Sequence, residues 1–165
     1  MGRTALVTGA TRGIGRETVR QLCAEGFRVF ATGRDRQLLN ALGEETGCLG
    51  ATCDLSDAAA TVALYAAARD ALGQIDVLVN NAGFNPGKNA VVDTSTDQMD
   101  ASYAVNFRAA FLLCREAMKE MSGRRDGHIL NVISSLARTS ATNYSAYCSL
   151  KHALHGFTQC LIKEA

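Results

Sequence analysis

The sequence predicts an α/β fold in which helices cover both faces of a doubly wound parallel β-sheet. Three observations support this prediction. Short apolar or β-branched segments alternate with longer segments of helical periodicity, as expected of parallel strands joined by helical crossovers. The length of 165 residues fits one domain of ordinary size. With 47% hydrophobic and 20% charged residues, the composition is that of a chain that folds.

Strands are predicted where apolar and β-branched residues form short runs, and five such runs occur, at residues 4–8, 28–32, 48–53, 75–79 and 128–133. Helical periodicity predicts a first helix that ends near residue 24, followed by helices at residues 35–47, 56–72, 95–122 and 144–165. Asp35 and Ser56 are expected to cap the second and third helices at their N-termini. Gly26 and Gly47 are expected at the C-terminal ends of the first and second.

The number of strands defines the expected domain. The dinucleotide-binding version of a doubly wound sheet, the Rossmann fold, has six strands in the order 3-2-1-4-5-6. Five strands are predicted, so residues 1–165 are expected to form a single dinucleotide-binding domain of Rossmann type that is incomplete at its C-terminus. The C-terminal strands are missing by this count, which makes strand five an unprotected edge.

Composition excludes several classes of protein. The chain has 17 Lys and Arg and 16 Asp and Glu, so its net charge is +1. A nucleic-acid-binding protein is expected to be strongly basic, so this class is excluded. No apolar stretch approaches the length of a membrane span and no signal core precedes the first strand, so a cytoplasmic protein is expected. The six cysteines form no C-x-x-C pair and are interpreted as buried, reduced thiols. The three histidines lack zinc spacing with any cysteine, so no metal site is expected.

A glycine-rich turn follows the first strand and reads Thr-Gly-Ala-Thr-Arg-Gly-Ile-Gly over residues 8–15. Glycines allow a tight turn and let backbone N–H groups approach a pyrophosphate at the start of a helix. The alternative is a flexible glycine turn with no ligand. The position between a strand and an amphipathic helix favours the phosphate site. Its candidate cofactor-binding residues are Gly9, Thr11, Arg12, Gly13, Ile14 and Gly15.

Arg34, after the second strand, stands where a dinucleotide site reads the adenosine ribose. With Arg12 it is a candidate to bind the 2′-phosphate of NADP, an anion that guanidinium groups suit. Asp35 complicates this reading, but its place at the start of a helix gives it a capping role. The alternative is that both arginines are solvated surface residues.

Tyr147 and Lys151 lie four residues apart, on the same face of the last predicted helix. A tyrosine needs a stabilised phenolate to act in acid-base chemistry at neutral pH, and a neighbouring ammonium supplies that stabilisation. Ser134, at the carboxyl end of the fifth strand, is placed on the ligand side of such a sheet, where its hydroxyl can orient a carbonyl oxygen. Considered alone, Tyr147 fits a half-buried packing residue as well as a catalytic one. Ser134 alone fits a turn residue as well as a catalytic one.

Four motifs in this order resemble the short-chain dehydrogenase/reductase family. They are the glycine turn, Asn80-Asn81-Ala82-Gly83, the segment Asn131-Val132-Ile133-Ser134, and the Tyr-x-x-x-Lys pair that ends at Lys151. The resemblance spans nearly the whole chain. Members of that family continue into further strands and a substrate lid, which this sequence lacks.

The resemblance implies roles for individual residues. Tyr147 is the implied proton donor or acceptor, and Ser134 holds the substrate carbonyl. Lys151 binds the nicotinamide ribose and stabilises the phenolate. Asn106 is the asparagine that distorts a helix and supports a water relay from the lysine, with an ordinary polar helix residue as the alternative. These four residues are the predicted catalytic group.

Further residues are implied to contact the cofactor. Asp54 is expected to hydrogen-bond adenine, with capping of the following helix as the alternative. Gly33 stands about where NAD-preferring relatives carry Asp, so NADP(H) is expected in preference to NAD(H). The other implied cofactor contacts are Leu55, Asn81, Ala82, Gly83, Tyr147 and Lys151.

The resulting expectation is an NADP(H)-dependent oxidoreductase that transfers hydride between nicotinamide and a small-molecule carbonyl or secondary alcohol. The family also implies a homo-oligomer, a dimer or tetramer, for a full-length chain. A sugar-nucleotide epimerase or dehydratase shares the fold and the Tyr-Lys pair, but the glycine spacing argues against it. A second alternative is an incomplete fragment that binds nucleotide or dimerises without catalysis, which the missing C-terminal strands support.

Overall fold

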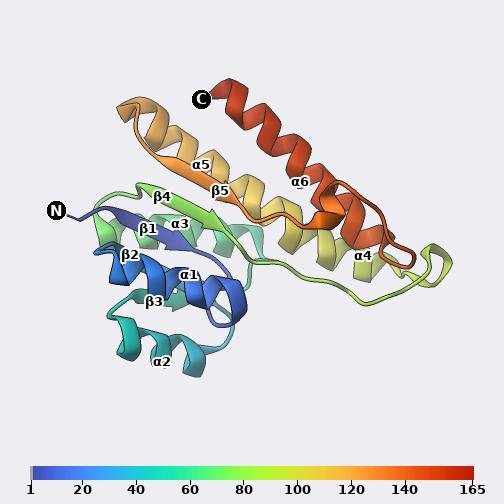
Figure 1. Cartoon of the computed structure of the whole chain (residues 1–165), viewed down its shortest axis with the longest axis horizontal. Helices are drawn as coiled ribbons and strands as arrows, with labels where there is room; N and C mark the ends of the chain where they lie inside the picture. Colours follow the sequence, from blue (N-terminus) through green and yellow to red (C-terminus); the bar gives the residue numbers. More distant parts are fainter. Residues whose placement is uncertain (1) are drawn as a thin grey trace.

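The computed structural model describes residues 2–165 as one five-stranded parallel sheet flanked by helices (Figure 1). The strand order is β3-β2-β1-β4-β5, which confirms the predicted order for the five strands present. The strands are β1 Thr4–Val7, β2 Arg28–Gly33, β3 Leu49–Thr52, β4 Val77–Asn80 and β5 His128–Asn131. Each predicted strand exists, with ends that differ from expectation by one or two residues.

Six α-helices connect and follow the strands. They are α1 Gly13–Ala24, α2 Arg36–Thr46, α3 Ala58–Leu72, α4 Thr96–Tyr103, α5 Ala109–Arg124 and α6 Ser145–Glu164. Short turns of 3-10 helix lie at η1 Val91–Asp93 and η3 Ser135–Ala137, and one π-helical turn, η2 Ala104–Arg108, separates α4 from α5. Over residues 2–165, none of these helices has the length and apolar character needed to cross a bilayer.

The ends of α2 follow the predicted signals, whereas the start of α3 does not. Asp35 accepts a hydrogen bond from the Leu38 amide at 3.1 Å, and Gly47 ends α2 with a φ of 74°. The expectation that Ser56 opens α3 is wrong. Asp57 is the cap, since its carboxylate accepts from the amides of the second and third helical residues at 2.8 and 3.0 Å.

Each face of the sheet builds its own core, because successive side chains of a strand point to opposite faces. Leu6 and Leu78 belong to the core under α3 and α5. Val7 and Val79, their neighbours in sequence, belong to the core under α1 and α2. Burial on both faces is what a doubly wound sheet requires, and it leaves the carboxyl ends of the strands as the place for a ligand.

The sheet edge at β5 and the last helix complete the fold. In residues 2–165, β5 pairs with β4 alone, and Leu130 of β5 is half exposed. Helix α6 crosses the α5 side of the sheet, where Phe157 packs against the same core as Leu6 (Figure 1). A hydrogen bond links α6 to the edge strand, because the side-chain amide of Asn131 in β5 donates to Thr158 Oγ1 in α6 at 2.9 Å.

The six cysteines are free thiols, but the expectation that all are buried is wrong. Cys53, Cys114 and Cys148 are buried, whereas Cys160 is exposed on α6. Burial raises the pKa of the Cys114 thiol to about 11. Cys114 is therefore a neutral packing group at physiological pH.

Candidate active site

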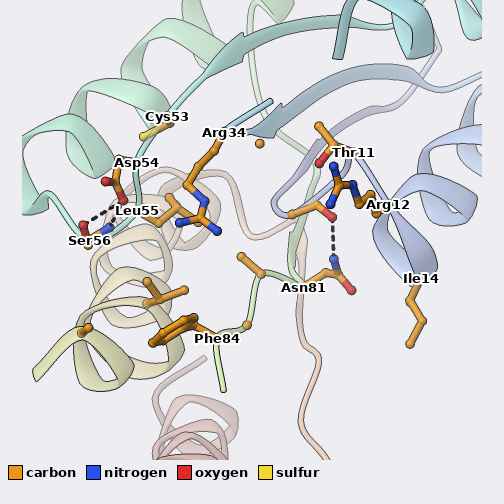
Figure 2. A pocket seen from close by; sticks show the side chains of 16 residues that line it. Thr11, Arg12, Ile14, Arg34, Cys53, Asp54, Leu55, Ser56, Asn81 and Phe84 are labelled. Atoms are coloured by element: carbon orange, nitrogen blue, oxygen red, sulfur yellow. Dashed lines mark hydrogen bonds between the residues drawn. The ribbon is translucent and has the colours of Figure 1, made fainter. Parts of the chain in front are cut away.

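A cavity of about 450 Å³ opens at the carboxyl ends of the strands. It is lined by most of the predicted cofactor residues, namely Gly9, Thr11, Arg12, Ile14, Arg34, Asp54, Leu55, Asn81, Ala82 and Gly83. Figure 2 shows Arg34 reaching into it, with Asp54 and Ser56 on one side and Thr11 and Arg12 on the other. Segments far apart in sequence thus form one binding space.

Several lining residues were not predicted as site residues. They are Gly33, Cys53, Ser56, Phe84, Ala101 and Val105. A signal existed for them, because all but Ala101 adjoin a predicted residue in sequence, and Ala101 lies about one helical turn before Val105. Conversely, Gly13, Gly15, Ser134, Asn106, Tyr147 and Lys151 do not line this cavity.

The glycine turn has two different requirements for glycine. Gly9 has a φ of 63°, and a Cβ there would lie 2.8 Å from the Cα of Ala82. Gly13 also has positive φ, at 53°, and nothing lies within 4 Å of where its Cβ would be. Gly15 instead packs against the Gly9 carbonyl and the Asn81 side chain, behind the turn. Gly9 therefore borders the cavity in a crowded position, and the backbone at Gly13 is open.

The N-terminus of α1 is free to receive an anion. In the described residues no side chain caps this helix, whose N-cap residue is Arg12. The first N–H groups of a helix have no partner within it, and the helix dipole favours negative charge there. Asn81 fixes the preceding turn by donating to the carbonyls of Thr8 and Gly9 at 2.9 and 3.1 Å. A phosphate group thus finds a preorganised cradle.

The two arginines of the cavity have different environments. Arg12 pairs with Asp35 Oδ2 at 3.3 Å, and its side chain remains largely exposed. The same carboxylate caps α2 through Oδ1, so Asp35 has the capping role expected of it and restrains Arg12 as well. Arg34 projects between the two walls of the cavity (Figure 2). Both guanidinium groups are thus available to one ligand.

Asp54 shapes the wall opposite the glycine turn. Its Oδ1 accepts from the Ser56 amide at 2.9 Å and from the Ser56 hydroxyl at 2.8 Å. These hydrogen bonds lower the pKa of Asp54, and Arg34 adds a smaller effect in the same direction. The alternative that Asp54 caps the next helix is wrong, because Asp57 does so. Asp54 is instead an ionised carboxylate at the cavity wall.

Asn106 lies in the π-helical turn between α4 and α5, a region predicted as one continuous helical segment. It is 1% exposed. Its side-chain amide donates to the Phe84 carbonyl at 2.5 Å and to the Ser102 carbonyl at 3.0 Å, and its Oδ1 accepts from the Phe84 amide at 3.1 Å. Both the nitrogen and the oxygen of the amide are hydrogen-bonded to Phe84, so this side chain fixes the loop after β4.

Lys151 is almost fully buried, with 3% of its surface exposed, although lysine side chains are rarely buried. Its ammonium donates to the Val132 carbonyl at 3.1 Å and lies 5.7 Å from the centre of the Tyr147 ring. Within residues 2–165 it makes no ion pair, and burial lowers its pKa. A buried unpaired ammonium is costly, and such groups are characteristic of functional sites.

Lys151 and Asn106 meet at the end of the cavity. A Cβ on Gly83 would lie 3.4 Å from Asn106 Oδ1 and 3.6 Å from Lys151 Nζ. Gly83 itself lines the cavity. The tertiary structure therefore brings two of the four predicted catalytic residues to the end of the same space that the glycine turn borders.

Ser134 and Tyr147 lie on the segments next to these residues. Ser134 Oγ accepts from the Leu136 amide at 3.2 Å and caps η3, which packs against α6. Tyr147 belongs to the first turn of α6 and is half-buried. Because the Ser134 oxygen is the acceptor in that bond, its hydroxyl proton remains free to be donated.

Comparison with known proteins agrees with this geometry. A family model described as short chain dehydrogenase matches residues 3–165. A relative from Sinorhizobium fredii, named an uncharacterized short-chain type dehydrogenase/reductase, is 40% identical over 157 residues, which cover 95% of this chain and 61% of the relative. L-xylulose reductase of Homo sapiens is 36% identical over 165 residues, covering 99% of this chain and 66% of that protein.

Solved structures show the same likeness. A metagenomic short-chain oxidoreductase in complex with NADP is 34% identical, with a TM-score of 0.95 over 99% of this chain and 76% of that one. An actinorhodin polyketide ketoreductase with NADPH is 34% identical, with a TM-score of 0.91 over 97% of this chain and 64% of that one. The chain thus spans about three fifths of the length of the Sinorhizobium relative. On this evidence the chain belongs to the short-chain dehydrogenase family.

Proposed function

We propose that the chain binds NADP(H) in the cavity and acts as an oxidoreductase on a small-molecule carbonyl or secondary alcohol. The observation that carries the proposal is the buried ammonium of Lys151, placed with Asn106 against Gly83 at the end of the cavity. Two structural relatives are described with NADP and NADPH bound. The relatives reported above are named as dehydrogenases and reductases, which favours this reaction over the epimerase alternative.

The residues present fit a dinucleotide. The uncapped N-terminus of α1 and the open glycine turn suit the pyrophosphate, and Arg34 with Arg12 suits a 2′-phosphate. Asp54, Leu55 and the neighbouring Ser56 form the wall for the adenine. When bound, the nicotinamide exchanges a hydride with the substrate carbon.

The protein's own contribution is to hold the substrate oxygen and move a proton. In the reducing direction, the Tyr147 hydroxyl donates its proton to the carbonyl oxygen while the Ser134 hydroxyl donates a hydrogen bond to it. The buried ammonium of Lys151 stabilises the phenolate that remains, because a charge interacts strongly where water is excluded. Lys151 uses one donor on Val132 and keeps two for a ribose hydroxyl and a water molecule.

The side chain of Asn106 has a positioning role in this scheme. Its amide nitrogen donates to the Phe84 and Ser102 carbonyls and its Oδ1 accepts from the Phe84 amide, so it holds the loop that carries Gly83. Asn106 lies in the π-helical turn η2, and such single turns within α-helices are frequent at functional sites. In the water relay that the family resemblance implies, Asn106 therefore acts by positioning the loop next to Lys151.

Partners and location are part of the proposal. The family resemblance implies a dimer or tetramer in which α4, α5 and α6 pair with a second copy. Tyr103 and Phe111, which lie about two-fifths exposed beside Phe107, offer an aromatic surface for it. Free thiols at all six cysteines suit a reducing compartment, so a cytoplasmic location is proposed.

The test measures nucleotide binding and turnover separately. We expect wild-type chain to bind NADPH more tightly than NADH and to reduce a small diketone. Tyr147→Phe should abolish turnover while leaving NADPH affinity within about twofold, because the phenol is a proton donor and not an anchor. Undiminished turnover by this variant would disprove the assigned acid. Tight NADPH binding by wild type without any turnover would support the alternative of a nucleotide-binding fragment.

A further inference from the structure

Gly33 ends β2 at the ribose end of the cavity, and its backbone does not require glycine. It pairs with Thr52 of β3 in regular parallel register, and its carbonyl accepts from the Cys53 amide at 3.2 Å. In residues 2–165 it is not among the glycines of positive φ. Something other than backbone conformation must therefore explain a glycine at this position.

The side chain of Thr11 occupies the space that a larger residue at position 33 would need. A Cβ built on Gly33 would lie 2.5 Å from Thr11 Cγ2, 3.0 Å from Oγ1 and 3.3 Å from Cβ. Cγ2 and Oγ1 make the two closest approaches, whereas the contact with Cβ needs a shift of only a few tenths of an ångström. Threonine is also restricted in χ1 because it is β-branched. Position 33 is therefore sterically closed by Thr11.

The turn that carries Thr11 is anchored and cannot retreat cheaply. Ala10 is fully buried, and its amide donates to the Thr32 carbonyl at 2.9 Å. Gly9 is held on the other side by the Asn81 side chain. Moving Thr11 away from Gly33 would break these contacts. A side chain introduced at position 33 would therefore lack room, because the turn does not shift to accommodate it.

Position 33 matters because the residues at the end of the second strand read the adenosine ribose of a dinucleotide. An acidic side chain there accepts the 2′-hydroxyl of NAD, whereas an arginine accommodates the 2′-phosphate of NADP. We propose that Thr11 is a specificity-determining residue, which excludes an acidic side chain from position 33 and leaves the ribose to Arg34. This inference rests on the proposed binding of NADP(H) in the same cavity.

The experiment compares the affinities of four chains for NADH and NADPH by fluorescence titration. They are wild type, Gly33→Asp, Thr11→Ala/Gly33→Asp and Thr11→Val/Gly33→Asp. Alanine removes both outer atoms of Thr11, whereas valine keeps the branched shape and loses only the hydroxyl. We expect Thr11→Ala/Gly33→Asp to bind NADH about tenfold more tightly than either Gly33→Asp or the valine variant, because only alanine opens the space.

A Gly33→Asp chain that binds NADH within about twofold of the alanine double variant would overturn the steric assignment. Should Gly33→Asp fail to fold, Gly33→Ala and Thr11→Ala/Gly33→Ala give the same comparison by thermal unfolding. The double variant is then expected to recover the melting temperature that Gly33→Ala loses, and no recovery overturns the inference. A wild-type chain that does not favour NADPH would refute the proposed cofactor instead. The variants would still show whether the side chain of Thr11 limits what fits at position 33.

Discussion

Arg108 donates from its guanidinium to the backbone carbonyl of Ser56 at 2.5 Å. The arginine belongs to the π-helical turn that also carries Asn106, and Ser56 lines the cavity next to Asp54, at the proposed place of the adenine. One turn of five residues thus holds both ends of the site, because Asn106 fixes the loop at Gly83 while Arg108 fixes the wall at Ser56. The Arg108 guanidinium also lies 5.9 Å from the centre of the Tyr103 ring. Within residues 2–165 its buried Nε has no hydrogen-bond partner.

Arg108→Met is expected to weaken binding of adenosine 2′,5′-bisphosphate about fivefold, because the Ser56 wall loses its anchor. Isothermal titration calorimetry measures this directly. Arg115→Met is the matched control, since Arg115 is an exposed arginine of α5 that pairs with Glu116. Equal affinities of the two variants would show that Arg108 does not position the wall.

Asn106→Ala should destabilise the chain by about 2 kcal/mol, because the partly buried amide and carbonyl of Phe84 lose their partner and the buried carbonyl of Ser102 loses a donor. Urea unfolding gives the free energy. Asn85→Ala is the control, because Asn85 is exposed and makes a local turn contact with Gly87. A loss of stability no larger than that of the control would contradict the role given to Asn106.

Lys151 should make stability depend on pH. Its pKa is lowered by burial from an ordinary value of 10.5, so between the two values the unfolded chain binds more protons than the folded one. Wild-type stability therefore rises with pH across that window, and the cost of burying the ammonium is fully present below it. Lys151→Met removes this dependence, so its stability relative to wild type should be highest at neutral pH and decline toward pH 10.5.

Urea unfolding at several pH values checks this expectation. Lys163→Met is the control, because Lys163 is exposed on the same helix and its removal should give no such trend. A difference between Lys151→Met and wild type that stays constant from neutral to alkaline pH would mean that the buried group is not charged as described.

Asp57→Ala should cost about 1 kcal/mol of stability through the loss of the α3 cap. The neighbouring Ser56→Ala is the control, since it removes an exposed hydroxyl that contacts Asp54 and leaves the cap in place. For a chain of this size the expected fall in melting temperature for Asp57→Ala is about 2–4 °C. A larger fall in melting temperature for Ser56→Ala than for Asp57→Ala would show that Ser56 caps α3.

The sequence by itself determined the order of elements, the parallel sheet and most of the cavity. These follow from local rules. Apolar runs define the strands, Gly47 and Asp35 bound a helix, and glycines mark the phosphate turn. Right-handed crossovers between parallel strands then bring the carboxyl ends of the strands to one edge. Spacing and charge placed Lys151 beside Tyr147 as the group that stabilises a phenolate. The family resemblance alone pointed to Asn106, whose role neither residue type nor spacing would have assigned.

Only the tertiary structure decided how these residues meet. Whether Asp57 or Ser56 caps α3 depends on a difference of one residue in where the helix begins, which propensity does not resolve. The contact of Asn106 with Phe84, the contact of Arg108 with Ser56 and the closure of position 33 by Thr11 all join segments distant in sequence. Such contacts are set by the space left after packing, to within fractions of an ångström, and that space exists only once the sheet has assembled.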